Sequence, residues 1–81
     1  MKRYDLRHLK ANFLTRMGEL VKSSQNGEVS QFIFEIGDFS SVEKSANLIN
    51  GLNSTLLNSI KFNRSDWIIT VKKGKIWKFL T

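Results

Sequence analysis

Apolar residues recur at spacings of three and four between positions 9 and 21, which predicts an amphipathic helix. Asp5 is a candidate N-cap, because its carboxylate can accept the free N–H groups of a first turn. The helix is expected to end near Asn26-Gly27, where the glycine can supply a left-handed C-terminal cap. Residues 4–6 are predicted to form either a short edge strand or the lead-in to the helix. The apolar stripe consists of Leu9, Phe13, Leu14, Met17, Leu20 and Val21.

The stretch from Gln31 to Glu43 joins a buried strand to a second helix. Phe32, Phe34 and Ile36 occupy alternate positions, so they share one face of a strand predicted over residues 29–36. We expect that face to pack on the first helix. Gly37 breaks the strand, and Ser40 with Glu43 has the spacing of a capping box that opens a helix. The apolar face of this second helix consists of Val42, Ala46, Ile49 and Leu52.

Two further strands are predicted between residues 56 and 71. Residues 56–62 alternate in part between apolar and polar, and residues 67–71 are aromatic and β-branched. The turn-forming tetrapeptide at 63–66 lies between them, so the two strands should form an antiparallel hairpin. Lys73-Gly74 is expected to begin another turn. Residues 75–81 are then either an extra strand, centred on 76–80, or an ordered tail.

The order of elements is helix, strand, helix, strand and strand. It predicts one domain, residues 1–81, of the α+β class: a two-layer sandwich with two helices packed on one face of a small mixed or antiparallel sheet.

Composition removes several kinds of chemistry. The chain has no cysteine, which excludes a disulfide, a thiolate nucleophile and a cysteine-ligated iron–sulfur cluster. With His8 as its single histidine, a zinc site of the usual His/Cys kind is not expected. We find no arrangement typical of a nucleophilic triad or a carboxylate pair, so no catalytic residue is predicted. No apolar run approaches the ~20 residues of a membrane span, and no secretory signal is evident, which favours a cytoplasmic location.

The net charge of +6 is unevenly distributed along the chain. Residues 1–10 carry +3, residues 11–60 carry −2 and residues 61–81 carry +5. Such asymmetry favours an acidic partner, although it does not distinguish a protein from a phosphate-bearing ligand, a nucleic acid or a membrane surface.

The turn Asp38-Phe39-Ser40-Ser41, which follows Gly37, is the first candidate binding site. The N-terminus of a helix presents free N–H groups and the positive end of the helix dipole, which suit an anion or phosphate. The alternative is an ordinary strand-to-helix connection with a serine cap. Asp38 argues against a phosphate because it adds negative charge, and the segment lacks the glycine spacing of a nucleotide-binding loop.

Trp67 with Arg64 is the second candidate. An indole face can stack on the isoalloxazine ring of FMN or FAD, and a guanidinium can approach the phosphate. The alternative is a strand tryptophan that closes one edge of a thin core. Whether the corner at Asp38-Phe39-Ser40 is functional depends on whether Trp67 lies beside it.

Basic and aromatic residues alternate in the C-terminal run from Lys72 to Phe79. This pattern suits single-stranded nucleic acid or a membrane interface, and it equally suits an edge strand protected by lysines. A small basic nucleic-acid-binding protein is therefore the alternative functional hypothesis, although no known RNA-binding motif is present.

Three segments resemble a known family. They are K-R-Y-D-L-R-x-L-K at the N-terminus, F-I-F-E-I-G-D-F-S-S from Phe32, and L-L-N-S-I-K-F-N-R-S-D-W-I-I-T-V-K-K from Leu56. Together they resemble the small protein known as the E component of NADH-quinone oxidoreductase in ε-proteobacteria. The resemblance covers roughly residues 1–73, and G-D-F-S and F-N-x-x-D-W-x-I-x-V are its most specific parts.

The resemblance implies a component of the electron-input end of respiratory complex I, on the cytoplasmic side of the inner membrane. The standard E component holds a two-iron cluster through four cysteines, so this chain cannot perform that redox step. It is instead expected to replace that component in position. Its implied partners are other subunits of the complex and an acidic flavodoxin-type carrier, and contact with FMN or FAD is a further implication. A flavin-dependent reductase is the enzymatic alternative, and it would turn over NADH as an isolated protein.

Overall fold

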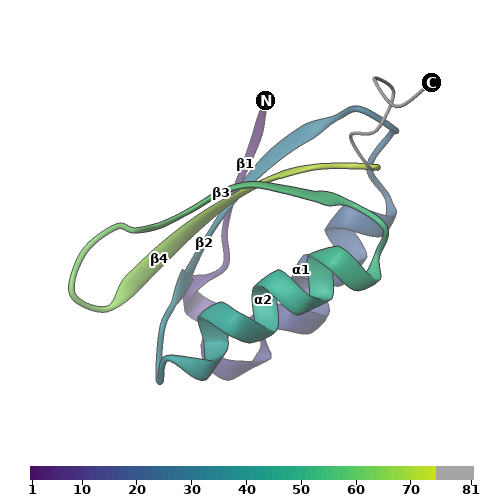
Figure 1. Ribbon diagram of the computed structural model, residues 1–81. Coiled ribbons are helices and arrows are strands. Elements are labelled where there is room, and N and C mark those ends of the chain that lie inside the picture. Colours follow the sequence, from purple (N-terminus) through teal and green to yellow (C-terminus); the bar gives the residue numbers. More distant parts are fainter. Residues whose placement is uncertain (75–81) are drawn as a thin grey trace.

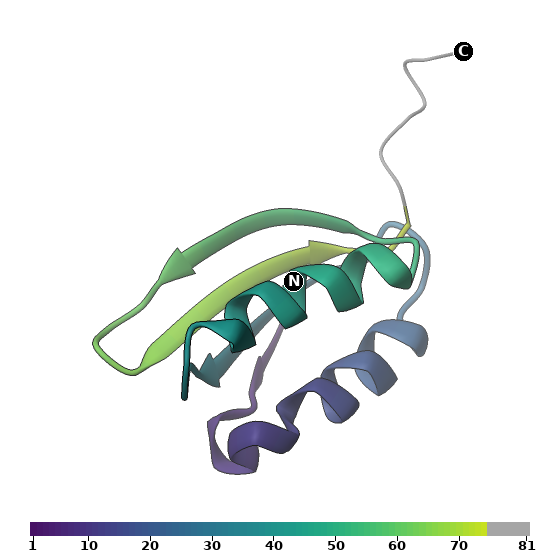
Figure 2. The same ribbon diagram turned by 60° about the horizontal axis from the view of Figure 1, so that its bottom comes forward.

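The computed structural model describes residues 1–74 as a four-stranded sheet with two helices on one face (Figures 1 and 2). The predicted two-layer α+β sandwich is confirmed. The expected strand or tail at 75–81 lies outside the described residues. In chain order the elements are β1 (Lys2–Asp5), the 3-10 helix η1 (Arg7–Asn12), α1 (Phe13–Lys22), β2 (Val29–Glu35), α2 (Ser40–Gly51), β3 (Thr55–Lys61) and β4 (Asp66–Lys72).

The sheet is mixed, with the strand order β1-β2-β4-β3. β1 pairs with β2 in parallel, so the segment at residues 4–6 begins in an edge strand. β4 is antiparallel to both of its neighbours, β2 and β3, which confirms the predicted hairpin. The two central strands, β2 and β4, therefore come from distant parts of the sequence.

The core lies between the sheet and the two helices. Phe32 and Phe34 are fully buried on the helix-facing side of β2, as their alternation predicts. Phe13 of α1 stacks on Phe34 with ring centroids 4.2 Å apart. Ile36, which was expected to continue this face, lies just beyond the end of β2, and its N–H donates to the carbonyl of Ser65 at 2.7 Å.

The first helix begins differently from the prediction. A 3-10 helix precedes α1, and Lys10 inside it has a φ of 52°, a left-handed value that an amphipathic pattern does not reveal. Asp5 is not the N-cap, because it is the last residue of β1 and Leu6 precedes the helix. Its carboxylate instead accepts the backbone N–H of Arg7 at 3.1 Å.

The C-terminal end of α1 is capped from the sheet. The ammonium of Lys73 donates to the carbonyls of Val21, Lys22 and Ser24 at 2.8, 3.0 and 3.3 Å. Gly27 does have a left-handed φ of 85°, but it lies in the connection beyond the helix end, where its N–H donates to the carbonyl of Lys73. A cation at this end of a helix satisfies terminal carbonyls and complements the helix dipole.

Candidate functional site

Trp67 stands near the start of β4, opposite Phe34 of β2 and Lys61 of β3. Its side chain is half-buried, and the indole Nε1–H donates to the hydroxyl of Ser59 at 2.7 Å. The position of the indole is therefore fixed by a hydrogen bond from β3 as well as by packing. A fixed, partly exposed ring is a suitable surface for stacking.

The corner between β2 and α2 is organised by Asp38. Its carboxylate accepts the N–H of Ser40 at 2.8 Å and also a short hydrogen bond from the Ser40 hydroxyl. These two hydrogen bonds, with Lys44 nearby, hold the pKa of Asp38 below its usual value. The predicted capping box is wrong, because Ser40 is already the first helical residue and donates its hydroxyl rather than accepting a free N–H.

The structure brings two of the predicted site residues into contact. Phe39 packs edge-on against Trp67, with ring centroids 6.2 Å apart and an interplanar angle of 86°. The side chain of Phe39 is 71% exposed, so the pair forms an aromatic corner open to solvent. The corner at Asp38-Phe39-Ser40 and the tryptophan of β4 are thus one surface.

Arg64 is separate in its interactions from this aromatic corner. It lies in the exposed turn between β3 and β4 and makes no hydrogen bond or ion pair with any residue in 1–74. Its contribution to a flavin phosphate stays a prediction.

A small cavity of about 170 Å³ lies on the other side of the corner, between η1, α1 and the start of α2. Asp38, Ser40 and Ser41 contribute to its lining, together with Lys10 and Lys44. Lys10 is paired with Glu35 at 3.1 Å, so much of the positive charge is neutralised. Pockets that enclose a cofactor-sized ligand are typically about 300–1,000 Å³, which means that a flavin would have to lie on the surface here.

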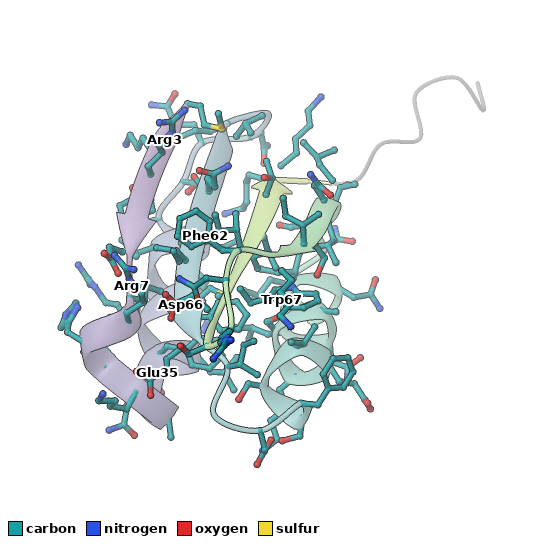
Figure 3. The ribbon with its side chains drawn as sticks, turned by 90° about the vertical axis from the view of Figure 1, so that its left-hand side faces the viewer. Arg3, Arg7, Glu35, Phe62, Asp66 and Trp67 are labelled. Carbon is teal, nitrogen blue, oxygen red and sulfur yellow. The ribbon has the colours of Figure 1, made fainter. Side chains whose placement is uncertain are left out.

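A polar network explains part of the segment F-N-x-x-D-W. The side-chain oxygen of Asn63 accepts the N–H groups of Ser65 and Asp66 at 2.9 and 2.8 Å, and its amide nitrogen donates to the Asp66 carboxylate at 2.9 Å. Arg7 reaches the same carboxylate at 3.2 Å from η1, and the two side chains face each other in Figure 3.

Arg7 also forms a two-pronged contact with Asp5, at 2.6 and 2.9 Å. The hydrogen bonds from Arg7 lower the pKa of Asp5 to about 2, and those to Asp5 and Asp66 raise the pKa of Arg7. Sequence reasoning missed this network, because Arg7 and Asp66 are brought together only by the tertiary fold. Its role in the structure is to fasten the hairpin turn to β1 and η1.

The basic C-terminal run is described only as far as Gly74. Within that part, the ammonium of Lys73 is occupied by three carbonyls of the α1 end, so it is not available to a phosphate. Lys75 to Phe79 lie outside the described residues.

Within residues 1–74, no cluster of three or more His, Asp or Glu side chains is arranged to hold a metal ion. None of the helices in the same range is long and apolar enough to cross a membrane.

The sequence matches a family model for the E component of NADH-ubiquinone oxidoreductase over residues 1–73. Among solved structures, it is similar to HP1264 from Helicobacter pylori, determined in solution, with 50% sequence identity and a TM-score of 0.64. That match covers 93% of this protein and 100% of the other. No curated protein matches the sequence.

Proposed function

Because the protein belongs to the family of the E component of NADH-ubiquinone oxidoreductase, we propose that it is a non-catalytic accessory subunit at the electron-input end of that complex. The observation that carries this proposal is the family match over residues 1–73, which spans almost all of the described structure. The role is to bind a larger subunit and hold a position in the assembly on the cytoplasmic side of the membrane.

The chemistry of the chain agrees with a binding role. It has no cysteine, so it cannot carry electrons through a cysteine-ligated cluster. Its net charge of +6 favours acidic partners and accelerates their association. An acidic flavodoxin-type carrier that delivers electrons to the complex would be attracted by the same charge.

We extend the proposal to a surface contact with FMN or FAD at the aromatic corner of Phe39 and Trp67. The two rings meet at the surface, and the indole is held in place by Ser59. This arrangement supports stacking of an isoalloxazine ring, whereas the adjacent cavity is too small to enclose one. The flavin would belong to the donor or to a neighbouring subunit as readily as to this chain.

The test is affinity purification of the tagged chain from its native cells under conditions that preserve respiratory complexes. We expect other subunits of the oxidoreductase to be recovered in stoichiometric amounts. Recovery of RNA or ribosomes without any respiratory subunit would overturn the proposal. The isolated chain, supplied with FMN or FAD, should show no NADH oxidation above that of the free flavin; sustained turnover would establish the enzymatic alternative instead.

A further inference from the structure

The face of the sheet that is turned away from the helices carries an apolar groove of about 310 Å³. Ile33 of β2 and Ile68 of β4 are direct cross-strand neighbours in its floor. Phe62, which follows β3, forms one side, and Arg3 of β1 forms the other. Figure 3 shows Phe62 lying across this face, with Arg3 on the same side of the sheet.

The groove continues into an exposed apolar strip. Ile60 pairs with Ile68, so three isoleucines stand side by side on β2, β4 and β3. Ile60 is 48% exposed and Phe62 is 55% exposed, although neither is needed to cover the core, which lies on the opposite face. Contiguous apolar surface of this kind on a small protein is characteristic of an interaction site.

The charges around the groove are not balanced. The nearby carboxylates are already neutralised within the chain, since Asp5 and Asp66 are paired with Arg7 and Glu35 is paired with Lys10. Arg3 makes no ion pair with any residue in 1–74. The groove therefore presents a hydrophobic floor beside one uncompensated guanidinium.

We propose that this groove is the surface through which the chain docks onto the larger subunit of its complex. The occupant is a protein segment that places an apolar side chain over Ile33 and Ile68 and a carboxylate beside Arg3. The inference rests on the proposed function, because it names the surface by which that function is carried out. A second copy of the chain is a poorer occupant, because a two-fold contact would face the groove with its own arginine and oppose two chains of net charge +6.

The test compares full-length tagged variants purified from native cells. Phe62→Asp introduces a charge into the side of the groove, and Arg3→Glu reverses its guanidinium. Leu57→Asp is a matched control for the first, since Leu57 is also an exposed apolar residue of β3 but does not line the groove. Lys22→Glu is the control for the second, since it reverses a charge at the exposed end of α1.

We expect Phe62→Asp and Arg3→Glu each to reduce the recovered respiratory subunits by at least about tenfold, and both controls to recover wild-type amounts. Circular dichroism and melting of each purified variant establish that it is folded, and Arg3→Glu decides the test if Phe62→Asp does not fold. If both groove variants retain the subunits, the groove is overturned while the proposed function stands. If the wild-type chain recovers none, the proposed function fails and the inference with it. If the wild type elutes as a dimer that Phe62→Asp dissociates, the occupant is a second copy and the inference is wrong.

Discussion

The ammonium of Lys73 lies 2.8 Å from the carbonyl oxygen of Val21, so a residue at the end of the sheet caps the first helix. The same nitrogen also donates to Lys22 and Ser24. One side chain thus satisfies three carbonyls that would otherwise depend on water.

Replacement of this lysine should lower stability substantially. Lys73→Met keeps the aliphatic stem but removes the three hydrogen bonds, and we expect a loss of about 2 kcal/mol in the free energy of unfolding. For a domain of this size that corresponds to a fall of roughly 10 °C in the melting temperature. Lys72→Met is the control, because it changes a neighbouring lysine of β4 that does not cap α1. Equal melting temperatures for the two variants would contradict the capping role.

The turn at Asn63 gives a second stability prediction. Asn63→Ala removes the acceptor of two backbone N–H groups and one donor to the buried Asp66 carboxylate. We expect a destabilisation of about 1–2 kcal/mol in chemical denaturation. Arg64→Ala, in the same turn, should change stability by less than about 0.5 kcal/mol, because its side chain is exposed and makes no ion pair within residues 1–74. A comparable loss in both variants would assign the effect to the turn backbone rather than to Asn63.

The pairing of Asp5 with Arg7 predicts a dependence of stability on pH. The pKa of Asp5 is about 2 in the folded chain, below its ordinary value of 3.8. Proton uptake therefore favours the unfolded state, so this contribution is complete above about pH 5 and is lost as the pH falls toward 2. The lowered pKa values of Glu28 and Asp38 act in the same direction.

Thermal melting between about pH 6 and pH 2 checks this expectation. Arg7→Gln should flatten the acid-induced fall in melting temperature, and added salt should reduce it in the wild type, since the Asp5 side chain is half exposed. Arg16→Gln, which breaks an exposed pair on α1, is the control and should leave the slope unchanged. A slope that is the same with and without Arg7 would contradict the assignment.

The flavin contact at the aromatic corner is tested by titration with FMN and with FAD. We expect the tryptophan fluorescence of the wild-type chain to be quenched in a saturable manner, because Trp67 is held at the surface beside Phe39. Trp67→Phe retains Trp77 as an internal reference and should lose the saturable component. Quenching that is equal in both proteins, or linear with flavin concentration, would mean that the corner binds no flavin.

Local patterns predicted the fold well where a single element carries the information. The alternation of Phe32 and Phe34 placed both rings in the core, and the β-branched run after Trp67 identified β4. The start of α2 was harder, because Ser40 and Asp38 are both capping residue types, and only the geometry shows that Asp38 accepts the N–H.

Long-range contacts could not be read from those patterns. Arg7 meets Asp66, and Lys73 meets Val21, only after the strands have been ordered in the sheet. The left-handed conformation of Lys10 has no marker either, since glycine is the residue that normally signals it. The candidate site was predicted as two separate pieces, and their contact through Phe39 and Trp67 depends on the register of β4 beside β2.

The strand order β1-β2-β4-β3 has a consequence for how the chain reaches its folded state. The β3–β4 hairpin is local and can form within microseconds, whereas joining β4 to β2 requires closure of the long loop that contains α2. Until that closure, the inner edge of β2 is unpaired and carries Phe32 and Phe34. An unpaired apolar edge is a template for aggregation, so a substitution that slows the closure would reduce the yield of folded protein without altering its final structure.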